Sequence, residues 1–183
     1  FEEHFDRVGE VDWVLEAVLE RMDVKRDVHA RIEAHARPDA VISTNTSGLP
    51  IHEIAEGRSE DFEGRFLGTH FFNPPRYQKL LEVVPMDRTE PSVVERVAQF
   101  GRLRLGKGIV VANDVPYFIG NRIGVFALME ALRYYTEGAY TIEEIDTLTG
   151  TLVGHPKSAT FRTADLAGLD VMRDEEQNLA VTL

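Results

Sequence analysis

Residues 68–74 read Gly68-Thr69-His70-Phe71-Phe72-Asn73-Pro74, an apolar strand-like run that reaches a histidine and then a turn signal. A second strand-like run follows, Leu80-Leu81-Glu82-Val83-Val84, with one carboxylate in its middle. An unpaired charge is costly to bury, so Glu82 needs a partner, and His70 lies one hairpin away. A paired His and Glu can move a proton on and off a hydroxyl near neutral pH.

Around this hairpin, strand and helix patterns alternate along the chain. The spacing of apolar residues predicts strands over 11–15, 41–43, 66–70, 81–85 and 109–112, and helices over 16–36, 49–55 and 91–103. The strand over 109–112 is expected to be buried. Strands separated by helices favour a mostly parallel sheet with helices on its faces.

After Asn113 the pattern becomes helical throughout. The sequence Asp-Val-Pro at 114–116 is a break, and helices are predicted over 117–138, from Thr141 to Gly150, and over 164–171. The first of these is expected to be buried on most sides. The predicted fold class is therefore α/β, with an α/β domain over 1–113 followed by an all-helical domain over 114–183.

Composition sets bounds on the function. The 183 residues carry 20 basic and 31 acidic side chains, so the formal net charge is 20 − 31 = −11. This charge argues against nonspecific binding to nucleic acid or to anionic membranes. No apolar run is long enough to span a bilayer, and cysteine is absent, which is consistent with a reducing cytoplasmic location. No histidine pair stands at metal-ligand spacing with a carboxylate, so no metal site is predicted.

Five short segments carry a family resemblance: Glu16–Glu20, Asn45–Ser47, His70–Pro74, Leu81–Val84, and Asn113–Pro116 with Asn121-Arg122. In this order and spacing they resemble the L-3-hydroxyacyl-CoA dehydrogenases, the NAD-dependent family of fatty-acid β-oxidation. The resemblance implies a doubly wound, Rossmann-type nucleotide domain, a helical domain that also forms a homodimer, NAD as cofactor and an acyl-CoA substrate.

The family's nucleotide domain begins with a Gly-x-Gly-x-x-Gly turn that receives the dinucleotide pyrophosphate at a helix N-terminus. This sequence contains no such turn. The chain also opens at Phe1 without methionine and stops on an apolar run at Leu183, so we expect a fragment with an incomplete Rossmann-type domain.

The absent turn leads to a prediction about cofactor affinity. We expect the 183-residue chain by itself to bind NAD poorly or not at all, because the main phosphate cradle is not part of it. Isothermal titration calorimetry of the isolated chain with NAD is the measurement. Micromolar binding would contradict the prediction.

The resemblance implies roles for four residues at the reacting centre. His70 would be the general base, and Glu82 would hold its imidazole and stabilise the imidazolium. Ser47 and Asn121 would position the substrate from the two domains. The alternatives are a core histidine for His70, an ion pair of Glu82 with Lys79 or Arg76, a loop hydroxyl for Ser47, and a polar residue at a helix N-terminus for Asn121.

Five further residues match the family's cofactor contacts: Ala17, Glu20, Lys25, Asn45 and Asn73. Glu20 and Lys25 could equally belong to a solvated helix face, since residues five apart do not form an ideal helical pair. Asn73, before a proline, could equally be a turn former.

The remaining histidines at 4, 29, 35 and 52 are interpreted as residues of polar helical stretches. Tyr117 stands where the family often has a small residue, and His155 also departs from the usual pattern, so acyl-chain preference stays open.

Two rival functions remain. One is a 6-phosphogluconate-type dehydrogenase, although the helix from Asn121 to Gly138 contains no lysine that could serve its chemistry. The other is a relative that kept the fold and lost turnover.

Overall fold

The computed structural model describes residues 2–167. The chain divides into two compact units, Phe1–Ile119 and Gly120–Leu183. The predicted domain boundary near Asn113 stays a prediction.

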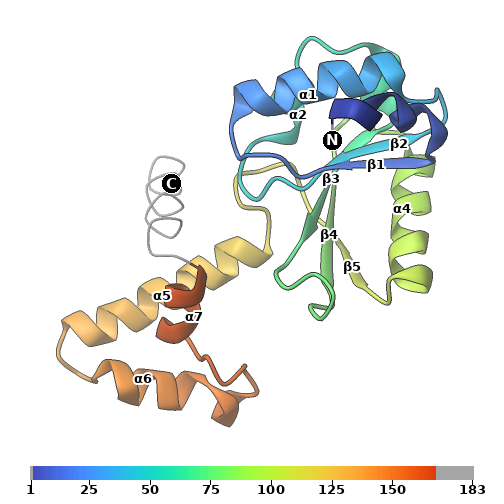
Figure 1. Cartoon of the computed structure of the whole chain (residues 1–183). Coiled ribbons are helices and arrows are strands. Elements are labelled where there is room, and N and C mark those ends of the chain that lie inside the picture. Colours follow the sequence, from blue (N-terminus) through green and yellow to red (C-terminus); the bar gives the residue numbers. More distant parts are fainter. Residues whose placement is uncertain (1, 168–183) are drawn as a thin grey trace. The chain divides into compact units, whose positions relative to one another are not determined.

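The first unit is built on a five-stranded sheet (Figure 1). Along the sheet, the strands follow the order β1-β2-β3-β4-β5, with β1 Trp13–Glu16, β2 Val41–Thr44, β3 Phe66–Phe71, β4 Leu80–Pro85 and β5 Gly108–Val111. The pairs β1-β2, β2-β3 and β4-β5 are parallel, while β3 and β4 are antiparallel. The predictions of an α/β fold, a mostly parallel sheet and an antiparallel hairpin are confirmed.

Helices cover both faces of the sheet (Figure 1). They are α1 Met22–His35, α2 Ile51–Ile54, α3 Glu60–Gly64 and α4 Pro91–Arg104, preceded by a 3₁₀ segment, η1, at Glu2–Glu10. Neighbouring strand residues point to opposite faces. Ile42, Phe66 and Val84 therefore pack in one core with α1, α2 and α3, whereas Val41, Leu67 and Val83 pack in a second core with α4.

The first helix and the last strand of this unit differ from their predictions. The first helix starts at Met22 instead of Glu16, because Glu16 ends β1 as a strand residue and its carboxylate is bonded there. The last strand, β5, is exposed rather than buried, and Val111 is 55% exposed. β5 is the end strand of this sheet, and of its residues only Ile109 packs against the core beneath α4.

The second unit is helical, as predicted. It contains α5 Gly120–Thr136, α6 Ile142–Thr149, a 3₁₀ turn η2 at Thr151–Val153, and α7 Phe161–Ala167. The predicted capping box of α6 is present, because Thr141 and Glu144 bond each other's backbone amides. The helix predicted over 164–171 begins at Phe161, and residues 168–171 lie outside the described part of the chain.

The helix predicted over 117–138 differs from α5 in two ways. Tyr117 and Phe118 have φ angles of 62° and 46°, in the left-handed region, so the helix begins only at Gly120. The helix is also not buried on most sides, since Ile123 and Phe126 are exposed. Among the helices of residues 2–167, none combines the length and apolar character that a bilayer-spanning segment requires.

Candidate active site

His70 and Glu82 form a buried pair at the centre of the sheet. They face each other across the antiparallel β3–β4 ladder, so their side chains emerge on the same face. The Nδ1 atom of His70 lies 2.7 Å from Oε2 of Glu82, and both side chains are almost fully buried. A carboxylate acceptor keeps the proton on Nδ1, which leaves Nε2 as the basic nitrogen.

A segment just before α5 completes the surroundings of this pair. The backbone N–H of Ile119 donates to Oε1 of Glu82 at 3.0 Å, so both carboxylate oxygens have a donor. The rings of Phe72 and Phe118 lie 4.4 and 5.7 Å from the imidazole, measured between centroids. Aromatic rings and the shared carboxylate thus restrict the orientation of His70.

The same segment also contacts the loop that carries Ser47. A Cβ atom at Gly48 would lie only 2.8 Å from Cε1 of Tyr117, so a side chain at this position would require the ring to shift. Tyr117 thereby packs on one side of the Ser47 loop, while the adjacent Phe118 packs against His70. This role of residues 117–119 was not predicted, because nothing in the Asp-Val-Pro break signals that the chain returns to the sheet.

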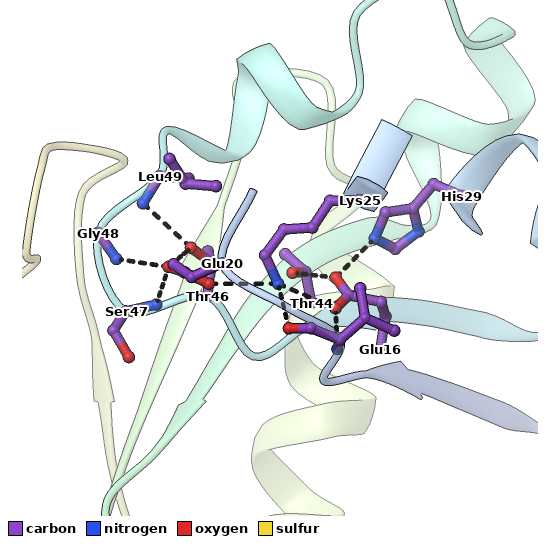
Figure 2. Close-up of polar contacts among 10 residues, drawn as sticks. Glu16, Glu20, Lys25, His29, Thr44, Thr46, Ser47, Gly48 and Leu49 are labelled. Carbon is purple, nitrogen blue, oxygen red and sulfur yellow. Dashed lines mark hydrogen bonds and ion pairs between the residues drawn. The ribbon is translucent and has the colours of Figure 1, made fainter. Parts of the chain in front are cut away.

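A buried polar cluster lies at the carboxyl ends of β1 and β2 (Figure 2). The Oε1 atom of Glu16 accepts from Nζ of Lys25 at 2.9 Å and from the Val18 backbone at 2.6 Å. Its Oε2 atom accepts from the Thr44 hydroxyl at 2.6 Å and lies 3.2 Å from Nε2 of His29. Glu16 was the sequence signal for this cluster. It is a single acidic residue at the end of an apolar strand, so it requires a buried partner for the same reason as Glu82.

His29 lies in the helix α1, as predicted, but its side chain is fully buried against Phe62 and Phe66. Burial lowers the pKa of His29, and the Glu16 carboxylate opposes that shift without reversing it. Burial alone would raise the pKa of Glu16. Hydrogen bonds from His29, Thr44 and Lys25, with the Lys25 charge, outweigh it and lower that pKa to about 2.

These shifts predict that acid destabilises the protein in two stages. A histidine with a lowered pKa binds its proton more readily in the unfolded chain, so stability falls as the pH drops below about 6.5. Glu16 contributes stability above its unfolded pKa of 4.5, and that contribution is lost as the pH falls towards 2.

His29→Phe separates the two stages. We expect the variant to lose the dependence of the unfolding free energy on pH between about 6.5 and 5, which is at most about 1.4 kcal/mol per pH unit for one proton. Urea unfolding at several pH values measures it. His35→Phe, which changes an exposed histidine at the end of α1, is the control. An unchanged slope in His29→Phe would contradict the assignment.

Three of the predicted cofactor residues line one cavity of about 590 Å³. Ala17, Asn45 and Asn73 lie around it with Leu15 and Phe71. The Oδ1 atom of Asn45 accepts the Phe71 backbone N–H at 2.9 Å, which ties the loop after β2 to the end of β3. The cavity lies at the carboxyl ends of β1, β2 and β3, where open α/β sheets bind their ligands.

The other two predicted cofactor residues belong to the polar cluster. Lys25 is 1% exposed and its ammonium lies between the carboxylates of Glu16 and Glu20. Glu20 precedes α1 and is half exposed, so the alternative of a shared solvated helix face is wrong.

Asn121 lies in the first turn of α5, in the second unit. Within residues 2–167, no group of three or more His, Asp or Glu side chains is arranged to hold a metal ion.

Comparison with known families accounts for both units. Residues 1–115 match the family model described as 3-hydroxyacyl-CoA dehydrogenase, NAD binding domain, and residues 118–182 match the C-terminal domain of the same family. The chain belongs to the 3-hydroxyacyl-CoA dehydrogenase family. The resemblance drawn from the five sequence segments is thereby confirmed.

Individual relatives agree with this family. The chain is 51% identical over 171 residues to a probable 3-hydroxyacyl-CoA dehydrogenase of Deinococcus radiodurans, covering 93% of this chain and 49% of the relative. It is 45% identical over 178 residues to a probable 3-hydroxyacyl-CoA dehydrogenase of Bacillus subtilis, covering 97% of this chain and 23% of that protein. The chain thus spans about half or less of the length of these curated relatives.

Solved structures give the same answer for the fold. The crystal structure of the (S)-3-hydroxybutyryl-CoA dehydrogenase of Ralstonia eutropha superposes with a TM-score of 0.86 at 30% identity. That match covers 97% of this chain and 61% of the other.

Proposed function

We propose that the natural protein containing this chain oxidises L-3-hydroxyacyl-CoA to 3-oxoacyl-CoA with NAD as hydride acceptor. The observation that carries the proposal is the hydrogen bond between His70 and Glu82, formed by buried side chains in a member of this family. The pair leaves one basic nitrogen, Nε2, held in a fixed direction.

In the proposed reaction, Nε2 of His70 removes the proton of the C3 hydroxyl as hydride leaves C3. The imidazole becomes an imidazolium, and Glu82 stabilises its positive charge across the 2.7 Å contact. NAD supplies the acceptor for the hydride. In the reverse direction, the imidazolium returns the proton to the developing alkoxide. The Ile119 amide holds the second oxygen of Glu82, so the carboxylate keeps its direction during both steps.

The cavity at the carboxyl ends of β1 to β3 fits the nicotinamide end of NAD. Its volume of about 590 Å³ admits an aromatic ring, and Asn45 and Asn73 offer amide groups beside the small side chain of Ala17. We propose that these three residues contact the cofactor. The pyrophosphate would be held by the Gly-x-Gly-x-x-Gly turn of the family, which is not part of this sequence.

Ser47 and Asn121 are proposed to position the substrate near C3 from the two domains. Support for Ser47 comes from its loop, which Tyr117 and Glu20 hold from two sides.

We also propose a homodimer formed through the helical domain, supported by the exposed apolar side chains Ile123 and Phe126 on α5. A cytoplasmic location stays a prediction from composition.

An absorbance assay tests the proposed function. NADH consumption with acetoacetyl-CoA is measured in the natural protein, with 6-phosphogluconate and NAD or NADP as the comparison. Turnover of the acyl-CoA alone supports the proposal. Turnover of the sugar acid alone supports the rival dehydrogenase, and binding of acetoacetyl-CoA without turnover supports a relative that lost catalysis.

A further inference from the structure

A chain of charged contacts connects the buried end of β1 to the loop that carries Ser47 (Figure 2). From Glu16 it passes to Lys25 and then to Glu20. We propose that Glu20, held by Lys25 and Glu16, is a positioning residue that fixes the backbone of the Ser47 loop and so directs the Ser47 hydroxyl. This inference rests on the proposed function in one respect only, namely that the Ser47 hydroxyl positions the substrate.

The outer end of this chain of contacts gathers three donors on one oxygen. The Oε1 atom of Glu20 accepts from the Thr46 hydroxyl at 2.5 Å, the Ser47 amide at 2.8 Å and the Gly48 amide at 3.2 Å. Two successive amides that converge on an anion form a concave binding site for negative charge, and bonds to an ionised acceptor are stronger than neutral ones. Thr46 in turn accepts the Leu49 amide at 3.0 Å. One carboxylate therefore organises the four consecutive residues 46–49.

The inner end gives Glu20 a rigid attachment. Lys25 belongs to α1, and its buried ammonium lies 3.3 Å from Oε2 of Glu20 and 2.9 Å from Oε1 of Glu16. Glu16 ends β1 and is bonded to Thr44 at the end of β2. The side chain of Glu20, which is 45% exposed, is thus tied through one lysine to a helix and to two strands of the sheet.

The arrangement holds the backbone of Ser47 and not its side chain. In Figure 2 the Ser47 hydroxyl points away from the Glu20 carboxylate, while the Ser47 amide points towards it. On another side of the loop, the Tyr117 ring occupies the space next to Gly48. The Glu20 carboxylate and the Tyr117 ring therefore confine the loop, while the Ser47 hydroxyl points away from the carboxylate.

The bonds of Glu20 within the protein point to a role in the loop, while the cofactor contact that the resemblance implied for Glu20 stays a prediction. Oε1 is already engaged by three donors and Oε2 by the Lys25 ammonium. The acceptor capacity of the carboxylate is directed into the loop and the polar cluster, so a change of Glu20 is expected to act through Ser47.

Amide hydrogen exchange on the 183-residue chain is the first test. Glu20→Gln keeps the size and removes the charge, so we expect the Ser47 and Gly48 amides to exchange about tenfold faster or more. The amides of Ile42 and Leu67 in the sheet report whether the fold is retained. Glu53→Gln, at an exposed glutamate of α2, is the matched control. Unchanged exchange at Ser47 and Gly48 would overturn the proposal.

Glu20→Asp provides a second variant if Glu20→Gln fails to fold. It keeps the charge and draws the carboxylate back by one methylene, so Lys25 retains a nearby anion while the bonds to the two loop amides lengthen. Faster exchange confined to Ser47 and Gly48 supports the proposal, and wild-type exchange at both amides overturns it.

A double-mutant cycle in the natural protein is the final test. We expect Glu20→Gln to lower kcat/KM for the hydroxyacyl-CoA about tenfold, with little further loss when Ser47→Ala is added, and with the pH midpoint of kcat unchanged because His70 is intact. Additive losses would mean that Glu20 acts independently of Ser47 and would overturn the inference. If the wild-type protein shows no acyl-CoA turnover, the proposed function fails, while the exchange experiment still decides how the loop is held.

Discussion

Replacing His70 by alanine in the natural protein is expected to lower kcat for the hydroxyacyl-CoA by about 10²–10⁴-fold, the usual contribution of a positioned general base. His70 is the basic member of the buried pair, with Nδ1 committed to Glu82 and Nε2 free to take a proton from substrate. The remaining rate would come from alignment of the hydride donor and acceptor. Steady-state NADH formation measures the change.

Two further variants make this result interpretable. Glu82→Gln should lower kcat and shift the pH optimum while preserving the fold, because the amide cannot stabilise an imidazolium as a carboxylate does. His52→Ala is the matched control, since His52 also bonds a carboxylate, at 2.6 Å from Asp114, but its side chain is exposed. His70→Ala with wild-type turnover would remove His70 as the base.

Replacing Lys25 by methionine is expected to destabilise the first unit by about 3–5 kcal/mol, the usual cost of leaving a buried charge without its partner. Glu16 would remain buried without the ammonium that lies 2.9 Å from its Oε1 atom in the folded protein. Urea unfolding, followed through the fluorescence of Trp13, measures the loss. Trp13 is the single tryptophan of the chain and its indole N–H bonds Ser43 inside the same unit.

The lost stability should return in part when both charges are removed. Glu16→Gln combined with Lys25→Met leaves no uncompensated ion, so we expect it to be more stable than Lys25→Met alone. Lys79→Met removes an exposed lysine and serves as the control for net charge, with an expected change of less than about 0.5 kcal/mol. Equal stability of Lys25→Met and Lys79→Met would show that the buried pair contributes nothing.

The parts of the fold that sequence predicted well are those decided by local pattern. Short continuous apolar runs defined the hairpin of β3 and β4, whose residues are buried on both faces, and helical spacing defined α4, which buries one face. The capping box of α6 needed only Thr141 and Glu144. The pairing of His70 with Glu82 followed because an acid inside an apolar strand requires a partner nearby.

The parts that failed depend on residues distant in sequence. Glu16 was assigned to a helix because its strand position is fixed by Thr44 and His29, which follow 28 and 13 residues later. His29 was interpreted only as a residue of a polar helical stretch, and its burial is shown by the packing of Phe62 and Phe66 against it. Tyr117 was placed in a helix because nothing local signals a left-handed backbone at a tyrosine.

The sequence by itself determined the order of strands and helices and the histidine–carboxylate pair, since these follow from periodicity and from the cost of burying a lone charge. Its five motif segments identified the family by resemblance. Only the tertiary structure decided that Lys25 lies buried between two carboxylates and that Glu20 holds the Ser47 loop. It also decided that Tyr117 to Ile119 contact the Ser47 loop on one side and the His70–Glu82 pair on the other. The physical reason is that these contacts join segments far apart along the chain, and they exist only when the sheet has brought the ends of its strands together.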